Sequence, residues 1–157
     1  IPRKKWLWYS ILTVLVVVLQ ISFNVQTAKH VQSTAEGWAV LIGYSGTNFA
    51  ELGIYIALFF LVPLMEELIY RGLLQHAFFK DSRFALDLLL PSILFALPHF
   101  SNFPSLLDIF VFATSGIIFA GLTRYTKSIY PSYAVHVINN IVATLPFLLT
   151  FLHRVFG

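Results

Sequence analysis

The chain has 157 residues, of which 58% are hydrophobic and only 11% are charged, and its mean hydropathy is +0.80. Soluble globular domains carry about 25% charged residues, so much of the surface of this chain must face lipid rather than water. The net charge of +3 does not indicate nucleic-acid binding, because the basic residues are scattered at the ends of apolar segments. The absence of cysteine excludes disulfides, thiolate metal sites and a cysteine nucleophile.

Hydropathy predicts about five membrane-spanning helices, separated by polar residues, prolines and glycines. In chain order they cover Trp6–Phe23, Phe49–Phe79, Phe84–Phe100, Ser105–Arg124 and Tyr130–His153. A polar loop with a short helix at Trp38–Ile42 is expected between the first two. The second helix is about 31 residues long, more than a bilayer core needs. Pro63 should kink it, because proline removes a backbone hydrogen bond.

These elements predict an all-α fold, a polytopic transmembrane helical bundle with one helix kinked at Pro63. We expect residues 1–48 to form the first transmembrane helix and a polar loop, and residues 49–157 to form the core of the bundle. Threading the helices back and forth leaves only Lys29 and Arg154 on one side of the membrane. The other basic residues fall on the opposite side: Arg3, Lys4, Lys5, Lys80, Arg83, Arg124 and Lys127. The positive-inside rule makes that side, with the N-terminus, cytoplasmic, so the chain is predicted to be an integral membrane protein.

The segment EELIYRG, which begins at Glu66, carries three charges inside the second predicted helix. A charged side chain at the centre of a membrane helix costs roughly 2.5 kcal/mol or more, so such residues pair or line a cavity. Glu67 and Arg71 are four residues apart and are expected to form an ion pair on one face of the helix. Glu66 lies about 100° around the helix from Glu67 and has no local cation. It therefore requires partners from other helices, and it suits a general base.

Two later helices can supply those partners. His99 lies about 15 residues from the predicted start of its helix, and Glu66 lies about 14 residues from the predicted end of its own, so both should lie about 21 Å from the basic side. His136 and Asn140 are four residues apart on one face, about 10 to 15 Å from the same side. A carboxylate, two imidazoles and an amide are thus predicted to converge in one polar cavity that opens toward the cytoplasm.

Three motifs in chain order describe this set. EELIYR reads as EExxxR, FALPH as FxxxH, and HVINN as HxxxN. This order on apolar helices resembles the CPBP family of intramembrane proteases, which includes the CAAX prenyl endopeptidases and bacterial bacteriocin-processing or immunity proteins. The resemblance covers about Ala50 to Leu149.

The resemblance implies an intramembrane endopeptidase that hydrolyses a peptide bond with activated water. By this resemblance, Glu66 and His99 activate the water, His136 and Asn140 stabilise the oxyanion of the tetrahedral intermediate, and Glu67 and Arg71 support the first motif. The implied partners are the lipid bilayer and a peptide or protein substrate that arrives from the membrane or the cytoplasm, with no nucleic acid. A small member of this kind is expected in a bacterial cell membrane.

Three alternatives remain open from the sequence. No cofactor is favoured, but Glu66, His99 and His136 are acceptable zinc ligands with a fourth position for water, although no HExxH motif is present. A serine protease could use Ser115 of the ATSG segment with His136, which would leave the charges of EExxxR unexplained. A non-enzymatic bacteriocin-immunity protein or peptide-binding membrane scaffold could use the same polar cavity.

Overall fold

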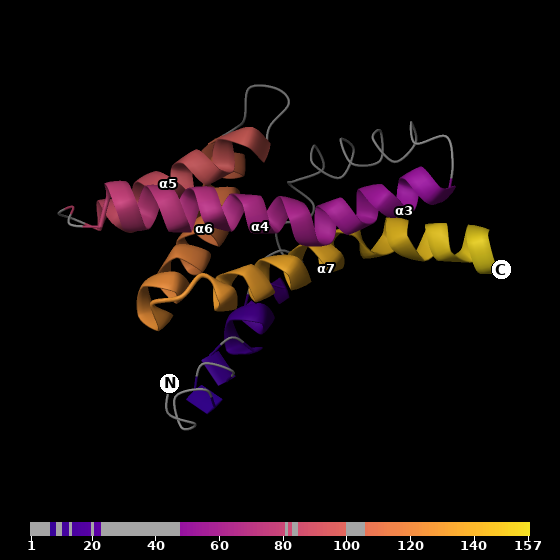
Figure 1. The fold of residues 1–157 in the computed structure, drawn as a ribbon, viewed down its shortest axis with the longest axis horizontal. Helices are drawn as coiled ribbons and strands as arrows, with labels where there is room; N and C mark the ends of the chain where they lie inside the picture. Colours follow the sequence, from indigo (N-terminus) through magenta and orange to yellow (C-terminus); the bar gives the residue numbers. More distant parts are fainter. Residues whose placement is uncertain are drawn as a thin grey trace.

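The structure is a computed structural model, and it describes residues 7, 8, 11, 12, 14–19, 21, 22, 48–80, 82, 85–99 and 106–157. All the regular structure in these residues is helical (Figure 1). The elements are α3 (Asn48–Ile56), η1 (Ala57–Leu61), α4 (Val62–Glu66), η2 (Glu67–Phe78), α5 (Leu86–Ala96), η3 (Leu97–His99), α6 (Leu106–Thr126) and α7 (Tyr130–Phe156). The predicted all-α class is therefore confirmed.

The segments from α3 to η2 join into one helix of 31 residues, Asn48–Phe78. Pro63 lies in the first turn of α4, and the preceding segment η1 is a π-helix. The Val62 N–H donates to the carbonyl of Ala57, five residues earlier. Such wide turns make room for the proline ring and accommodate its missing N–H without ending the helix. The axis changes direction between α3 and α4 (Figure 1), which is the form that the predicted kink takes.

Three described helices are long and apolar enough to cross a membrane: Asn48–Phe78, Ile109–Thr126 and Tyr130–Phe156. The apolar helix Leu86–His99 is shorter. These four agree with the last four predicted helices within a few residues. The described residues between positions 7 and 22 are helical, as expected of the first predicted helix, whereas the predicted short helix at Trp38–Ile42 lies outside the described residues.

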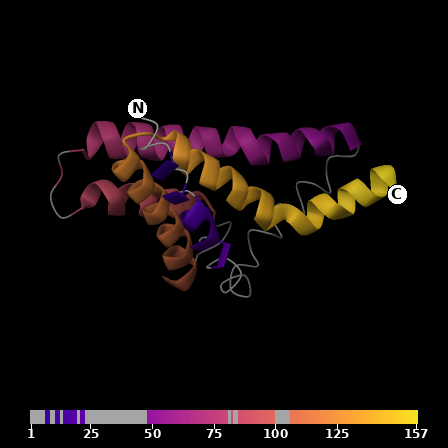
Figure 2. The same cartoon turned by 90° about the horizontal axis from the view of Figure 1, so that it is seen from below.

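The helices pack in two groups. Figure 1 shows α5 and α6 beside η2, and Figures 1 and 2 show the C-terminal part of α7 running along α3. A small-residue contact joins α5 to α6: a Cβ atom added at Gly116 would lie 2.9 Å from the Cα atom of Ser92. Small residues at such contacts let membrane helices approach closely.

Each group has its own buried apolar cluster. One contains Tyr55, Leu58, Phe59 and Phe151, where α3 and η1 meet α7. The other contains Phe95, Phe119, Leu122 and Val135, from α5, α6 and α7. Many large apolar side chains outside these clusters are exposed, as expected of helices that face lipid. The second cluster surrounds the polar residues described next.

Candidate active site

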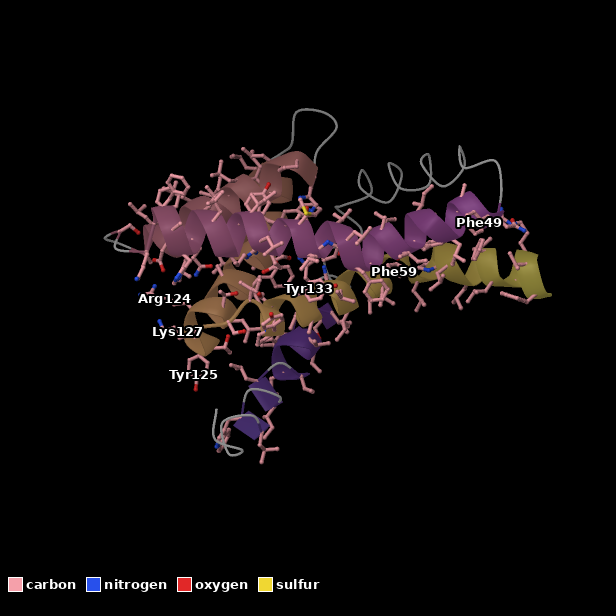
Figure 3. The ribbon with its side chains drawn as sticks, in the orientation of Figure 1. Phe49, Phe59, Arg124, Tyr125, Lys127 and Tyr133 are labelled. Atoms are coloured by element: carbon pink, nitrogen blue, oxygen red, sulfur yellow. The ribbon has the colours of Figure 1, made fainter. Side chains whose placement is uncertain are left out.

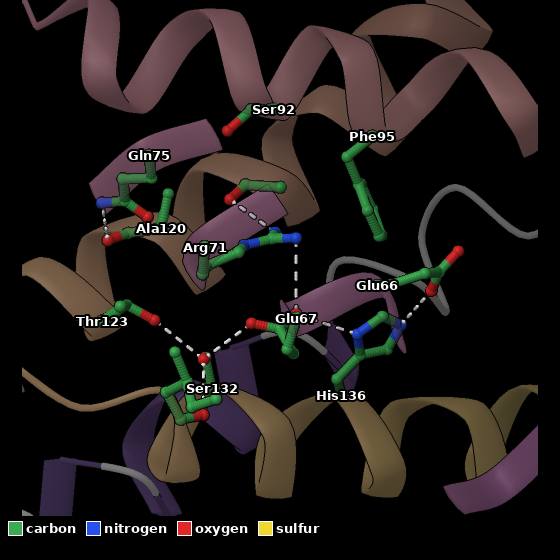
Figure 4. Close-up of polar contacts among 12 residues, drawn as sticks. Glu66, Glu67, Arg71, Gln75, Ser92, Phe95, Ala120, Thr123, Ser132 and His136 are labelled. Carbon is green, nitrogen blue, oxygen red and sulfur yellow. Dashed lines mark hydrogen bonds and ion pairs between the residues drawn. The ribbon is translucent and has the colours of Figure 1, made fainter. Parts of the chain in front are cut away.

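A buried ion pair between Glu67 and Arg71 forms the base of the polar cluster (Figure 4). Glu67 Oε1 lies 3.4 Å from Arg71 Nη1, and both side chains are fully buried. Arg71 Nη2 also donates to the carbonyl of Gly116 on α6, at 3.0 Å. The sequence predicted this pair from its i,i+4 spacing, and the contact to Gly116 extends it to a second helix.

Aromatic rings enclose the buried guanidinium. Its carbon Cζ lies 4.7 Å from the centre of the Phe95 ring and 5.3 Å from that of Phe119. These are cation–π distances, and such contacts stabilise a desolvated cation. Phe119 also stacks on His136, with ring centres 4.8 Å apart. Phe95 meets the same imidazole edge-on, with ring centres 5.5 Å apart, so the two rings both hold Arg71 and help to orient His136.

His136 of α7 bridges the two adjacent carboxylates of EExxxR. Its Nδ1 lies 3.0 Å from Glu67 Oε1, and its Nε2 lies 3.3 Å from Glu66 Oε2. Because a carboxylate accepts, the bond to Glu67 assigns a proton to Nδ1 and leaves Nε2 facing Glu66. Ser132, one turn earlier on α7, donates to Glu67 Oε2 at 2.7 Å. Glu67 thus has three partners, and Glu66 is the less committed of the two acids.

His99 approaches Glu66 from the other side. Its Nε2 lies 4.0 Å from Glu66 Oε1, and its Nδ1 lies 2.8 Å from the carbonyl of Phe95. The carbonyl can only accept, so Nδ1 carries a proton and the lone pair of the neutral ring lies on Nε2. A separation of 4.0 Å is longer than a direct hydrogen bond and is open to bridging by one water molecule. The Glu66 side chain is 19% exposed, so it is turned inward between two imidazoles and not out to the lipid.

Asn140 lies one turn beyond His136, and its described contact is with the long helix. Its Nδ2 donates to the carbonyl of Leu58 at 3.0 Å. In a π-helical turn that carbonyl would accept from the residue five positions later, which is Pro63 and has no N–H. The amide therefore supplies the donor that the proline lacks. The structure brings Glu66, His99 and His136 together, and it places the Asn140 amide against the backbone near Pro63.

Comparison with known families identifies the family of this chain. The family model described as type II CAAX prenyl endopeptidase Rce1-like matches residues 48–142, a range that contains all six predicted site residues. The chain belongs to this Rce1-like family. No curated protein and no solved structure matches the chain. Membership supports an integral membrane protein and an intramembrane endopeptidase of the CAAX-protease type, and it gives no support to a role in bacteriocin immunity.

The contacts in this Rce1-like chain give little support to the zinc and serine-protease alternatives that the sequence left open. In the described part of the chain, no group of three His, Cys, Asp or Glu side chains is arranged to hold a metal ion, so we derive no step through zinc. Ser115 Oγ lies 3.5 Å from the carbonyl of Val111 in its own helix. Both ring nitrogens of His136 face carboxylates, which does not favour a serine–histidine pair.

Several residues of the site were missed by the sequence reasoning. Ser132 lies four residues before His136, so the same helical spacing that paired His136 with Asn140 could have found it. Gln75 lies four residues beyond Arg71, and its Nε2 donates to the carbonyl of Ala120 at 3.0 Å. Phe119 carried no signal, because one phenylalanine among 16 on apolar helices cannot be singled out.

Proposed function

We propose that this Rce1-like chain hydrolyses a peptide bond within or at the edge of the bilayer, using water activated by Glu66 and His99. The observation that carries the proposal is the position of the Glu66 carboxylate between two imidazoles from two other helices, 4.0 Å from His99 and 3.3 Å from His136. Ionisable residues at membrane depth are functional by default. A carboxylate flanked in this way can accept a proton and pass it on.

In the proposed reaction, the water occupies the space between Glu66 Oε1 and His99 Nε2. Glu66 removes one proton as the water oxygen attacks the carbonyl carbon, so a C–O bond forms and the carbonyl oxygen becomes an oxyanion. The neutral His99 ring accepts the second O–H of the water and orients it. When the intermediate collapses, Glu66 returns its proton to the amide nitrogen and the C–N bond breaks.

His136 is proposed to act as an imidazolium, with a proton on each ring nitrogen, and to stabilise the oxyanion with its Nε2–H. Its ring is held at Nδ1 by Glu67 and against Phe119, so this donor is already oriented before charge develops. Preorganised donors of this kind account for a large part of catalysis in many enzymes. Asn140, expected to assist, uses one N–H on the carbonyl of Leu58, which leaves only the second N–H of the amide for this role.

Glu67 and Arg71 are proposed to position the site rather than to touch substrate. Both are fully buried, and the contacts of Glu67 to Ser132 and His136 fix α7 against the long helix. The substrate class is a peptide or protein. Because the family description names CAAX prenyl endopeptidases, a prenylated peptide is the natural first substrate to include.

The test is cleavage of a peptide library, with prenylated members, by the purified protein in detergent. Wild type should cleave, and Glu66→Gln should lower kcat by a factor of about 100 to 10,000, the usual worth of a general base. Ser115→Ala is the matched control and should keep the wild-type rate. Wild-type turnover by Glu66→Gln would refute the proposal, and loss of turnover in Ser115→Ala alone would favour the serine alternative.

A further inference from the structure

A hollow of about 560 Å³ lies at the end of the bundle where η2 and α6 finish. This volume is typical of a ligand pocket. Its lining comes from four segments: η2 and the residue after its C-cap, α5, the end of α6, and the turn before α7. The lining residues used below are Arg71, Gln75, Lys80, Asp87, Arg124 and Lys127. We call it the basic hollow, and none of the proposed catalytic groups lines it.

The rim of the basic hollow has an excess of positive charge. Lys80, Arg124 and Lys127 are all exposed, and Figure 3 shows Arg124 and Lys127 together at the end of α6. Asp87 is the one acidic group of the lining, and its Oδ1 lies 3.4 Å from Arg124 Nη1. Within the described residues, no ion pair involves Lys80 or Lys127. Two lysine charges therefore remain to attract an anion.

Two buried residues of the lining, Arg71 and Gln75, carry polar atoms that lack hydrogen bonds. Arg71 is fully buried, and its Nε has no hydrogen-bond partner. Gln75 is 5% exposed, and its Oε1 also has none. Buried polar groups normally find partners. The Arg71 Nε–H is a donor that suits an anion, whereas the Gln75 oxygen can only accept. The hollow therefore combines positive charge at the rim with one unpaired buried donor on a lining residue.

The position of the hollow identifies the kind of anion. Lys80 and Lys127 follow the ends of two candidate membrane spans, Asn48–Phe78 and Ile109–Thr126. Phe78 and Tyr125 beside them are 70% and 66% exposed, as is typical of side chains at a lipid interface. Basic pockets between transmembrane helices at this level bind lipid headgroups. A soluble anion would not need the flanking apolar surface.

We propose that the basic hollow binds the phosphate of an anionic phospholipid headgroup, with Lys80 and Lys127 as the principal charged contacts. The acyl chains of that lipid lie along the exposed apolar surface beside Phe78 and Tyr125. Arg71 lines the hollow and also pairs with Glu67, so the lipid site adjoins the candidate active site without sharing its catalytic groups.

The test uses the full chain in nanodiscs of phosphatidylcholine alone or mixed with phosphatidylglycerol. Retained lipid is measured by native mass spectrometry and stability by thermal unfolding. Wild type should retain phosphatidylglycerol and unfold at a higher temperature when it is present. Lys80→Gln/Lys127→Gln should weaken phosphatidylglycerol binding about 30-fold, from the usual contribution of a basic residue near a membrane surface. Lys80→Arg/Lys127→Arg is the matched control and should bind as wild type does.

Each alternative occupant of the basic hollow predicts a different result. Equal retention of phosphatidylglycerol by wild type and the Gln double variant would overturn the proposal, as would a wild type indifferent to this lipid. Stabilisation by inorganic phosphate in phosphatidylcholine alone, to the same extent as by phosphatidylglycerol, would assign the site to a free anion. Stabilisation by a peptide with a free carboxylate, but not by the lipid, would assign it to substrate. These readouts do not depend on proteolysis, so they stand even if the wild-type chain cleaves no peptide or Glu66→Gln keeps the wild-type turnover.

Discussion

Glu67→Gln is the change that most directly tests the difference between the two adjacent acids. The substitution keeps the size of the side chain but removes its charge and replaces one oxygen with a donor group. Glu67 is fully buried and contacts Arg71 at 3.4 Å, His136 at 3.0 Å and Ser132 at 2.7 Å. All three partners present donors to it, so the new amide group must face at least one donor. The Arg71 cation loses its counter-charge at the same time.

The expected loss in free energy of unfolding is large, because the ion pair between Glu67 and Arg71 is fully buried. Removing one partner of a buried ion pair destabilises by about 3–5 kcal/mol, which corresponds to a fall of roughly 6 to 20 °C in the unfolding temperature for a chain of this size. Glu66→Gln is the matched control, since Glu66 is partly exposed and its near contacts are the two imidazoles. It should change stability by less than about 1 kcal/mol.

The measurement is thermal unfolding of both variants in one detergent, alongside circular dichroism to establish that each is folded. We expect Glu67→Gln to lose stability and Glu66→Gln to keep it while losing turnover. Equal stability of the two variants would refute the assignment of Glu67 as the positioning acid. A Glu67→Gln variant as stable as wild type would show that the buried charge is not required.

The remaining predictions concern the other groups of the site. His99→Gln should lower kcat about 100-fold or more through loss of an oriented water, whereas His153→Gln, on the exposed last turn of α7, should leave it unchanged; equal rates would remove His99 from the mechanism. Asn140→Ala should lower stability by about 1–2 kcal/mol, because the carbonyl of Leu58 loses its donor; a fall of about 100-fold in kcat at unchanged stability would instead assign the amide to the oxyanion. Exhaustive chelation should leave cleavage intact, and a loss that added zinc restores would establish a metal enzyme.

Much of the fold could be predicted from the sequence because the bilayer imposes simple rules. Apolar length located the described helices, and their ends agree within a few residues. The distribution of basic residues also predicted which of them lie at the same end of the bundle. Lys80, Arg124 and Lys127 line one hollow. Arg154 lies at the other end of the long helix, where it pairs with Glu51. Matching depths along separate helices predicted that Glu66 and His99 would meet, since the rise per residue is nearly constant.

Rotation about the helix axis was harder to predict than depth. A wheel drawn at 100° per residue separates Glu66 from Glu67 and gives only Glu67 a partner. In the structure both acids reach one imidazole, at 3.3 and 3.0 Å, and the π-helix η2 begins between them. Wide turns change the angle between successive side chains, and no residue pattern in EELIYR signals them. The depth of His136 was also predicted to be shallower than that of Glu66, yet its ring lies nearer to Glu66 than that of His99 does.

Pro63 connects this local irregularity to the assembly of the site. Two side chains of α7 donate to carbonyls in the segment before the proline: Asn140 to Leu58 at 3.0 Å and Tyr133 to Phe60 at 3.2 Å. Tyr133, His136 and Asn140 follow the i, i+3, i+7 spacing of one helical face. Two polar contacts to an irregular backbone therefore fix the register of α7, and His136, which lies between them, is carried to the two carboxylates. A residue with an N–H at position 63 would satisfy the Leu58 carbonyl within the helix, and α7 would lose the Asn140 contact that helps to place the imidazole.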